Sequence, residues 1–150
     1  RPNAGHAALA GLAQRVPLSL VTQNVDDLHE RAGSVVDAHV HGSLFALRCF
    51  ACGRAHDGPL EDYVDGVQRV EPMRCVACGD RIRPGVVWFG EALPDDAWDT
   101  ATEAATRCML MLVVGTSGLV YPAAGLPAVA RRQGAIDIET HQTNGFRTFL

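Results

Sequence analysis

The sequence has 150 residues, 47% of them hydrophobic, and its 13 basic and 17 acidic side chains give a formal charge of −4. This length suffices for one ordinary core with a small extra lobe, but not for two full domains. The acidic balance argues against a nucleic-acid-binding surface, and no apolar run approaches the roughly 18 to 20 residues that cross a membrane. We therefore expect no membrane association, and we expect the protein to act as a monomer.

The first third of the chain predicts a helix and two strands. Apolar residues recur at helical spacing over residues 3–15, after Asn3, a residue type that caps helices. Residues 18–22 then predict a short buried strand that ends in the polar cluster of residues 23–27, and residues 35–40 predict a second strand that ends at His41. Ligands of parallel α/β sheets bind at the carboxyl ends of the strands, so both strand ends are candidate sites.

Two C-x-x-C pairs, 22 residues apart, are the strongest signal in the chain; they are Cys49 with Cys52 and Cys75 with Cys78. Each pair can direct two thiolates the same way, and two pairs complete the tetrahedral shell of a Zn²⁺ ion. Gly53 and Gly79 directly follow the pairs, where the chain must turn without a Cβ. A four-thiolate site has no open coordination position, so the metal would be structural. Four unmetallated thiols are the weaker alternative, because they would be prone to oxidation.

The fifth cysteine, Cys108, lies in an apolar run and is interpreted as a buried structural thiol. Four cysteines in a metal site and one left over do not make a disulfide framework. A reducing compartment fits this usage best, so we expect a cytoplasmic location.

The remainder of the chain alternates strands with helices. Residues 85–89 predict a strand and residues 95–107 a helix, and residues 109–114 form an apolar run typical of a strand covered on both faces. A small-residue loop follows at residues 115–118, then a predicted helix over residues 122–133 and a last strand over residues 135–139. This alternation predicts an α/β fold with a Rossmann-like, doubly wound parallel sheet, from which the cysteine lobe is an excursion.

The order of these motifs resembles the sirtuin family of NAD-dependent protein-lysine deacylases. The matching motifs are, in chain order, Pro2-Asn3 with His6, residues 22–29, Ala32-Gly33, His41-Gly42-Ser43, the two cysteine pairs, residues 83–91, Gly115-Thr116-Ser117 and residues 120–124. The resemblance covers about residues 2–139. Residues 86–91, together with Leu44-Phe45, are similar to the branch that includes bacterial cobalamin-type sirtuins and the mitochondrial desuccinylase.

The resemblance implies a deacylase, a deacetylase or desuccinylase, that transfers the acyl group of a protein lysine to ADP-ribose and releases nicotinamide. Its catalytic residues would be His41, the general base for a ribose hydroxyl, with Asn24 and Asp26, which would hold nicotinamide. The implied cofactors are NAD and Zn²⁺; the further NAD contacts would be Gln23, Gly115, Thr116 and Ser117. A neutral imidazole can accept a hydroxyl proton at physiological pH, whereas a lysine would already be protonated.

The implied partners are acyl-lysine proteins, whose peptide would add as a strand between two edges. One edge comprises Phe89, Gly90 and Glu91, and the other comprises Gly118, Leu119 and Val120. The implied organisation is an incomplete Rossmann-like NAD-binding part, residues 1–43 and 86–150, with a zinc-binding lobe over residues 44–85.

Structural alternatives stand beside these assignments. A lone His41 could be a hydrogen-bonded structural histidine, Asn24 and Asp26 could simply form a turn, and a Gly-Thr-Ser sequence is common where helices begin. His29 and His39 are interpreted as structural, and Trp88 as a core residue.

Two departures from the family pattern set a further expectation. The family's first strand and its Gly-Ala-Gly loop, which cradles the NAD pyrophosphate, have no counterpart in these 150 residues. Residues 140–150 also diverge, so no adenosine contact is assigned to Thr140 or His141. We therefore expect a fragment that keeps the zinc lobe and catalytic loops but has little or no deacylase activity, the alternative being an inactive zinc-containing binding module.

Overall fold

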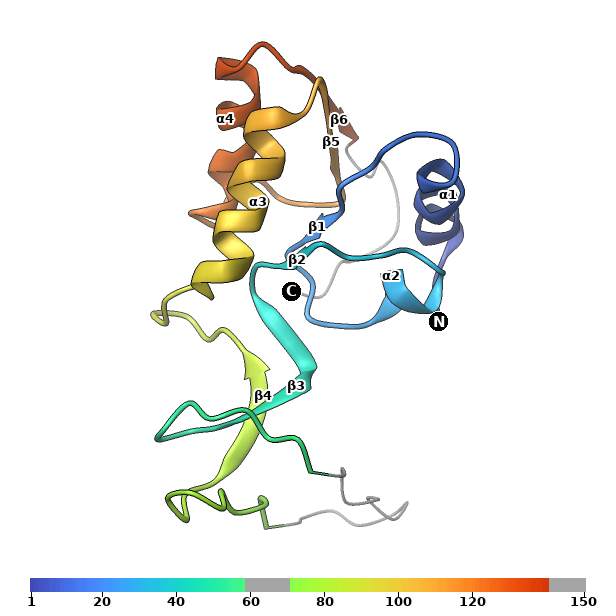
Figure 1. Cartoon of the computed structure of the whole chain (residues 1–150). Helices are drawn as coiled ribbons and strands as arrows, with labels where there is room; N and C mark the ends of the chain where they lie inside the picture. Colours follow the sequence, from blue (N-terminus) through green and yellow to red (C-terminus); the bar gives the residue numbers. More distant parts are fainter. Residues whose placement is uncertain (59–70, 141–150) are drawn as a thin grey trace.

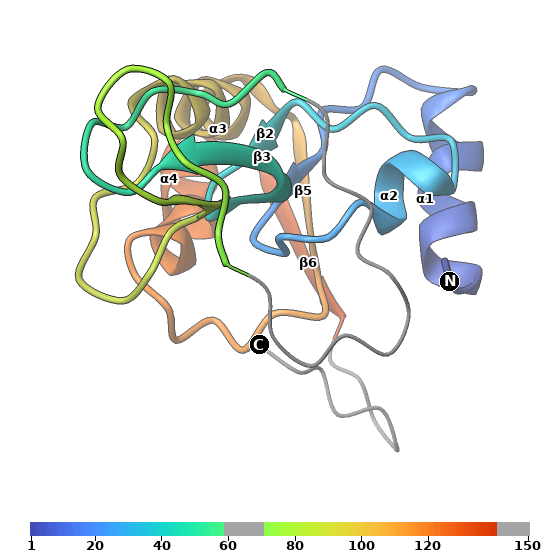
Figure 2. The same ribbon diagram turned by 90° about the horizontal axis from the view of Figure 1, so that it is seen from below.

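The computed structural model describes residues 1–58 and 71–140. Most of the predicted linker between the cysteine pairs lies outside these ranges, as do residues 141–150 of the divergent end, His141 included. The elements are α1 (Ala4–Ala13), β1 (Val21–Thr22), α2 (Leu28–Arg31), β2 (Ala38–His39), β3 (Gly42–Cys49), β4 (Ile82–Val86), α3 (Asp95–Arg107), β5 (Leu110–Val114), the 3-10 helix η1 (Ala123–Gly125), α4 (Leu126–Arg132) and β6 (Ile136–Thr140). Figures 1 and 2 show α3 and α4 on one side of β1 and β2, and α1 and α2 on the other. No helix in the described ranges is long and apolar enough to span a membrane.

Helix α1 begins where the sequence predicts. The Asn3 side chain accepts a hydrogen bond from the His6 amide at 3.1 Å, and the His6 ring in turn bonds the Asn3 amide, which forms a capping box. The helix ends at Ala13, four residues before Pro17, and leads into β1.

Helix α3 has the predicted bounds of 95 and 107. Asp95 and Asp96 lie in its first turn, where carboxylates stabilise the positive end of the helix dipole. Its inner face carries the small residues Ala101 and Ala105, which are buried and allow close approach to the strands.

The main body contains two separate parallel strand pairs. β1 pairs with β2 through Val21 opposite Ala38, and β5 pairs with β6 over five residues, beginning with Leu110 opposite Ile136. Within residues 1–58 and 71–140 the two pairs are not hydrogen-bonded to each other. The strands predicted over 18–22 and 35–40 are shorter than expected, because strand pairing covers only Val21–Thr22 and Ala38–His39, near their carboxyl ends.

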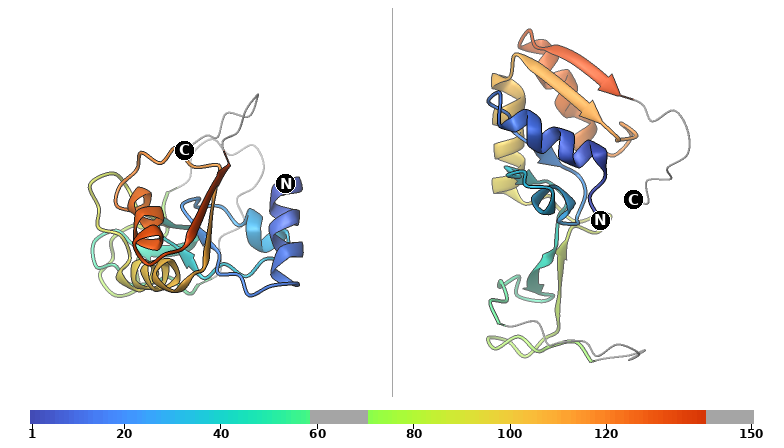
Figure 3. Two further views of the ribbon diagram at one scale, coloured as in Figure 1. Left: turned by 90° about the horizontal axis from the view of Figure 1, so that it is seen from above. Right: turned by 90° about the vertical axis from the view of Figure 1, so that its right-hand side faces the viewer.

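The prediction that β5 is covered on both faces is wrong. Met111 packs against the core that α3 and α4 cover and Val113 is half-buried, while Leu110, Leu112 and Val114 are 47%, 37% and 54% exposed. In register with them, Ile136 and Ile138 of β6 are 66% and 45% exposed, so one face of this pair is an apolar surface. Figure 3 (right) shows the paired strands β5 and β6 in front of α4. A continuous apolar run cannot distinguish one covered face from two, because it carries no alternation.

The main core lies between the parallel pairs and helices α3 and α4. Its buried members are Ala38, Val40, Ala101, Ala105, Ala123 and Leu126. Val40, which is fully buried, directly precedes His41, so the packing of β2 against α3 fixes the point from which the histidine projects.

The antiparallel pair β3–β4 extends away from the main body and carries the cysteine lobe (Figure 1). A second small core of Cys49, Cys75 and Ile82 holds the lobe together. Leu44 and Gly85, the residues at which we predict the domain boundaries, lie inside β3 and β4, so both strands run from the main body into the lobe.

Trp88 is not a core residue as predicted, because half of its surface is exposed. Its ring instead stacks on the guanidinium of Arg83, whose carbon lies 4.3 Å from the ring centroid, and it contacts the ring of Phe50. A cation–π contact of this kind stabilises an aromatic ring that remains partly exposed at the surface.

Candidate functional site

The four lobe cysteines form a cluster of metal-site geometry. All four Sγ atoms lie within 4.8 Å of one another; Cys49 and Cys78 are 3.4 Å apart and Cys52 and Cys75 are 3.7 Å apart. Tetrahedral coordination with Zn–S bonds of about 2.3 Å requires sulfurs about 3.8 Å apart, whereas a disulfide needs about 2.05 Å. The cysteines are free thiols, and their spacing fits Zn²⁺.

The knuckle turns are built as the sequence predicts. Gly53 and Gly79 have φ angles of 70° and 77°, in the left-handed region that favours glycine. Their amides donate to the carbonyls of Cys49 and Cys75, which closes each turn around its thiol pair.

The thiols of the cluster do not ionise alike. Hydrogen bonds from the backbone amides of Ala77 and Cys78 lower the pKa of Cys75 to about 6. A hydrogen bond from the Asp80 amide favours the Cys78 thiolate and by itself would lower the pKa of Cys78. The hydrogen bond with the Cys49 sulfur, burial and the other two cysteines outweigh it and raise this pKa to about 12. Four thiolates so close together require a cation, which Zn²⁺ would supply.

His41 lies in the turn between β2 and β3, half-buried beneath the end of β1. Its Nδ1 atom is 3.0 Å from the Gln23 carbonyl, which can only accept, so Nδ1 carries the proton and Nε2 is left as the basic nitrogen. The His41 carbonyl accepts from the Val87 amide at 2.9 Å, which ties the same turn to the end of β4. The imidazole is thus held in the tautomer that a general base requires.

Gln23 and Thr116 bring the two strand ends together. The Gln23 amide nitrogen donates to Thr116 Oγ1 at 3.2 Å across 93 residues of sequence, and Thr116 Oγ1 also accepts from the Gly118 amide. The predicted residues Gln23, His41 and Thr116 therefore form one cluster, as expected for parallel strands whose carboxyl ends share an edge.

Asn24 and Asp26 lie in the loop that follows β1. Asn24 is exposed, and its amide donates to the hydroxyl of the buried Thr22 at 3.1 Å. Asp26 accepts from the Leu28 amide at 3.0 Å, a turn-type contact at the start of α2 that leaves its second carboxylate oxygen available. One carboxylate oxygen of Asp26 therefore serves the turn, as the structural alternative expects. The nicotinamide roles of Asn24 and Asp26 stay predictions.

The loop after β5 offers its backbone to a ligand. Gly115 and Gly118 have φ angles of 68° and 66°, and a Cβ at either position would meet no atom within 4 Å. Ser117 is exposed, and its hydroxyl accepts from the Leu119 amide. Open space beside a hydroxyl and glycine amides suits the ribose and phosphates of a dinucleotide.

The two predicted peptide edges are exposed. Phe89 is 99% and Leu119 is 79% exposed, Gly90 has a φ of 89°, and Val120 is half-buried. Within the described ranges, no hydrogen bond joins residues 89–91 to residues 118–120. The Glu91 carboxylate, by contrast, bonds the guanidiniums of Arg48 and Arg83.

Arg48 and Arg83 are the residues that sequence reasoning missed. Arg83 is part of the 83–91 motif but has no predicted role, and Arg48, which directly precedes Cys49, has none either. The side chain of Arg83 is only 10% exposed and requires an anionic partner, which Glu91 supplies, but burial of this kind leaves no signal in the sequence.

The histidines assigned to structure do make local contacts. His39 Nε2 lies 2.7 Å from Glu30, and the His29 ring stacks on His6 with centroids 4.7 Å apart. Burial, and next the neighbouring His6, lower the pKa of His29 below its ordinary value.

The fold and the cluster at the strand ends define an α/β protein of Rossmann-like type with an inserted four-cysteine lobe. A family model described as "Sir2 family" matches residues 1–122, and the chain belongs to this family. The sirtuin resemblance and the predicted fold class are thereby confirmed.

Relatives and solved structures agree with this assignment. The chain is 51% identical over 141 residues to an NAD-dependent protein deacylase of Mycobacterium leprae, covering 94% of this chain and 59% of the relative. It is 54% identical over 138 residues to NAD-dependent protein deacylase 1 of Pseudomonas aeruginosa, covering 90% and 55%. A crystal structure of a Sir2 homolog–NAD complex superposes with a TM-score of 0.80 at 44% identity, over 93% of this chain and 53% of that one. A structure described as Sir2–p53 peptide–NAD⁺ gives 0.80 at 36% identity, over 93% and 57%.

The chain thus spans between half and two thirds of the length of the curated relatives it matches.

Proposed function

We propose that this chain supplies the catalytic base, part of the NAD site and the zinc lobe of an NAD-dependent protein-lysine deacylase. The names of its relatives and the ligands of its structural neighbours support the proposal. The observation that carries it is the cluster of His41, Gln23 and Thr116, in which an oriented imidazole lies beside polar groups from two strand ends.

The geometry suggests how the residues act. His41 Nε2 accepts a proton from a ribose hydroxyl while Nδ1 keeps its bond to the Gln23 carbonyl, which stabilises the imidazolium that forms. Bound in this site, NAD would supply an electrophilic anomeric carbon for the acyl oxygen, with nicotinamide as the leaving group. Gln23, Asn24, Asp26 and the 115–117 loop would orient the cofactor, and the four thiolates would hold Zn²⁺ away from the reaction.

The acyl-lysine peptide would lie between residues 89–91 and 118–120. Both segments are exposed, and added strands bind chiefly through main-chain hydrogen bonds. The free state of all five cysteines supports a reducing, cytoplasmic location. We further propose a monomer, which a sedimentation measurement of molar mass would test.

A chimera tests the function directly. The segment of the M. leprae deacylase that this chain matches is replaced by this chain, and NAD-dependent deacylation of an acetyl-lysine peptide is measured. We expect activity that His41→Ala abolishes and that the lobe variant His56→Ala, a matched imidazole control, retains. A folded, zinc-loaded chimera without deacylation would contradict the proposal and favour the binding module.

The 150-residue chain is assayed in parallel for nicotinamide release. We expect little or none, because the helix-terminal cradle for the pyrophosphate has no counterpart in this sequence. Robust release from the chain alone would refute that expectation.

A further inference from the structure

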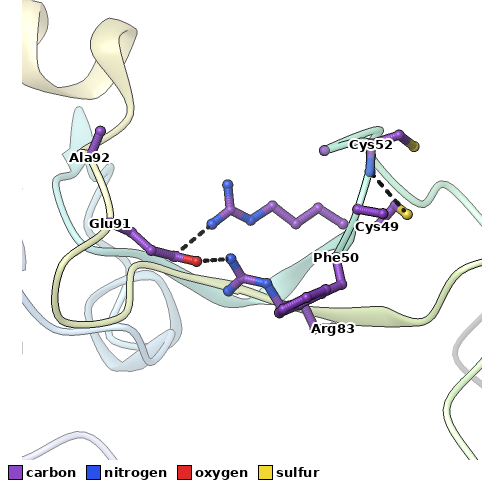
Figure 4. Close-up of a pocket in the computed structure, with 9 residues that line it drawn as sticks. Cys49, Phe50, Cys52, Arg83, Glu91 and Ala92 are labelled. Atoms are coloured by element: carbon purple, nitrogen blue, oxygen red, sulfur yellow. Dashed lines mark hydrogen bonds and ion pairs between the residues drawn. The ribbon is translucent and has the colours of Figure 1, made fainter.

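The loop that carries Phe89 is fastened to the cysteine lobe through one carboxylate. Glu91 Oε1 accepts from Arg83 at 2.5 Å and Oε2 accepts from Arg48 at 3.0 Å, and Figure 4 shows both guanidinium bonds; Oε2 also accepts from the Trp88 amide at 3.0 Å. The Glu91 amide donates in turn to the Trp88 carbonyl at 2.9 Å, so the turn from 88 to 91 is closed from both sides. The hydrogen bond from the Trp88 amide, and next Arg83 and Arg48, lower the pKa of Glu91, as expected for a fixed carboxylate.

Both arginines belong to the framework of the metal cluster. Arg48 directly precedes Cys49 on β3, and Arg83 lies opposite it on β4. Arg83 also donates to the Val86 carbonyl at 2.8 Å and lies over the rings of Trp88 and, at 5.8 Å, Phe50. Phe50 lies between the first two cysteines, and its amide donates to the carbonyl of Arg81, the residue just before β4.

The contacts form a continuous path from the first knuckle to the loop. Cys49 is flanked by Arg48 and Phe50, Arg83 lies over the Phe50 ring, both arginines bond Glu91, and Glu91 bonds the Trp88 amide. Because the Arg83 side chain is only 10% exposed and its charge is matched by Glu91, the pair has little freedom to rearrange. Phe89, at the tip of this turn, is 99% exposed and has no other support from its side chain.

We propose that Glu91 is a positioning residue, which makes the placement of the 88–91 loop depend on metal occupancy of the four-cysteine cluster. The proposal rests on the proposed function only in taking this loop as an acyl-peptide edge. Glu91 would then act through the loop and not by touching the peptide with its carboxylate. By linkage, peptide binding at the loop would in turn slow metal loss.

Trp88 reports the coupling without any need for turnover. The chain contains two tryptophans, so a Trp98→Phe background leaves Trp88 as the sole tryptophan, which is excited selectively over the tyrosines. We expect chelation of zinc to shift Trp88 emission to longer wavelength, because the ring loses its stack on Arg83. In Glu91→Gln the zinc-loaded protein should already emit at the longer wavelength, and chelation should change it little.

Glu103→Gln is the matched control, since it removes another glutamate–arginine pair, with Arg107, on the exposed face of α3. This variant should retain the full response of Trp88 to zinc. A full response in Glu91→Gln, with one zinc bound, would overturn the proposal.

A second measurement needs no substitution at the carboxylate. Amide hydrogen exchange of the unsubstituted chain is compared with and without zinc, with the amides of α3 as the internal standard. We expect the Trp88 amide to lose protection on zinc removal while α3 keeps its own; unchanged protection at Trp88 would refute the coupling.

The peptide step is tested separately. Zinc release to a chelator is timed with and without an acetyl-lysine peptide, which should slow release from the unsubstituted chain but not from Glu91→Gln. If the peptide has no effect while the Trp88 response is intact, the peptide role of the loop fails and the positioning role stands.

Discussion

Val40→Ala should destabilise the protein far more than the same substitution at Val35. Val40 has no exposed surface and lies in the main core, whereas Val35, five residues earlier, is 79% exposed. Two carbons leave with each substitution, and at about 0.8 kcal/mol per buried carbon the transfer loss at Val40 is about 1.6 kcal/mol. The cavity left between β2 and α3 raises the total to about 2 to 3 kcal/mol. At Val35, with about a fifth of the surface buried, the loss is about 0.3 kcal/mol.

Urea unfolding followed by far-ultraviolet circular dichroism, in zinc-saturated buffer, measures both values. The Val40→Ala midpoint should fall with the slope of the transition unchanged, since the surface exposed on unfolding hardly differs. Equal midpoints for the two variants would refute the assignment of Val40 to the core and the idea that this packing holds the turn of His41.

Three further outcomes follow from the structure. Metal analysis after purification under reducing conditions should give one zinc per chain, unchanged in Cys108→Ser; a stoichiometry near zero would rule out the metal site. The lowered pKa of His29, caused first by burial, means that the folded state disfavours its protonated form. The contribution of neutral His29 to the free energy of unfolding is therefore complete above the ordinary pKa of 6.5 and is lost as the pH falls through the lowered pKa. His29→Gln should flatten the acid side of a stability-against-pH profile, and an unaltered profile would argue against this. Gly42→Ala should disrupt β3–β4, because its Cβ would lie 2.0 Å from the Gly85 carbonyl oxygen, whereas Gly118→Ala has a similar φ and open space and should cost only about 1 kcal/mol. Thermal unfolding of the two variants decides this, and similar losses would count against the steric argument.

The sequence predicted those features that depend on local chemistry. Asn3 caps α1 and the acidic first turn begins α3 because capping is decided within a few residues. The cysteine cluster was predictable because ligand spacing alone brings four sulfurs together.

Features that depend on long-range packing were predicted less well. The exposed face of β5 and the exposed ring of Trp88 depend on which elements cover them, and apolar residue type does not encode that. The Arg48–Glu91–Arg83 network was missed because Arg48 lies 43 residues from Glu91 and outside the 83–91 motif, and because the motif does not show that its two end residues, Arg83 and Glu91, form an ion pair.

The bond between Gln23 and Thr116 has a consequence for how the chain folds. The bond closes a loop of 93 residues. Once Gly42 pairs with Val86, the residues between them no longer add to that loop, and roughly half of its length is left to be closed. Since each halving of a flexible loop saves about 0.6 kcal/mol of closure entropy, a lobe formed early brings the strand ends together more readily. A metal ion bound in the lobe would thus speed the assembly of a site that it never touches.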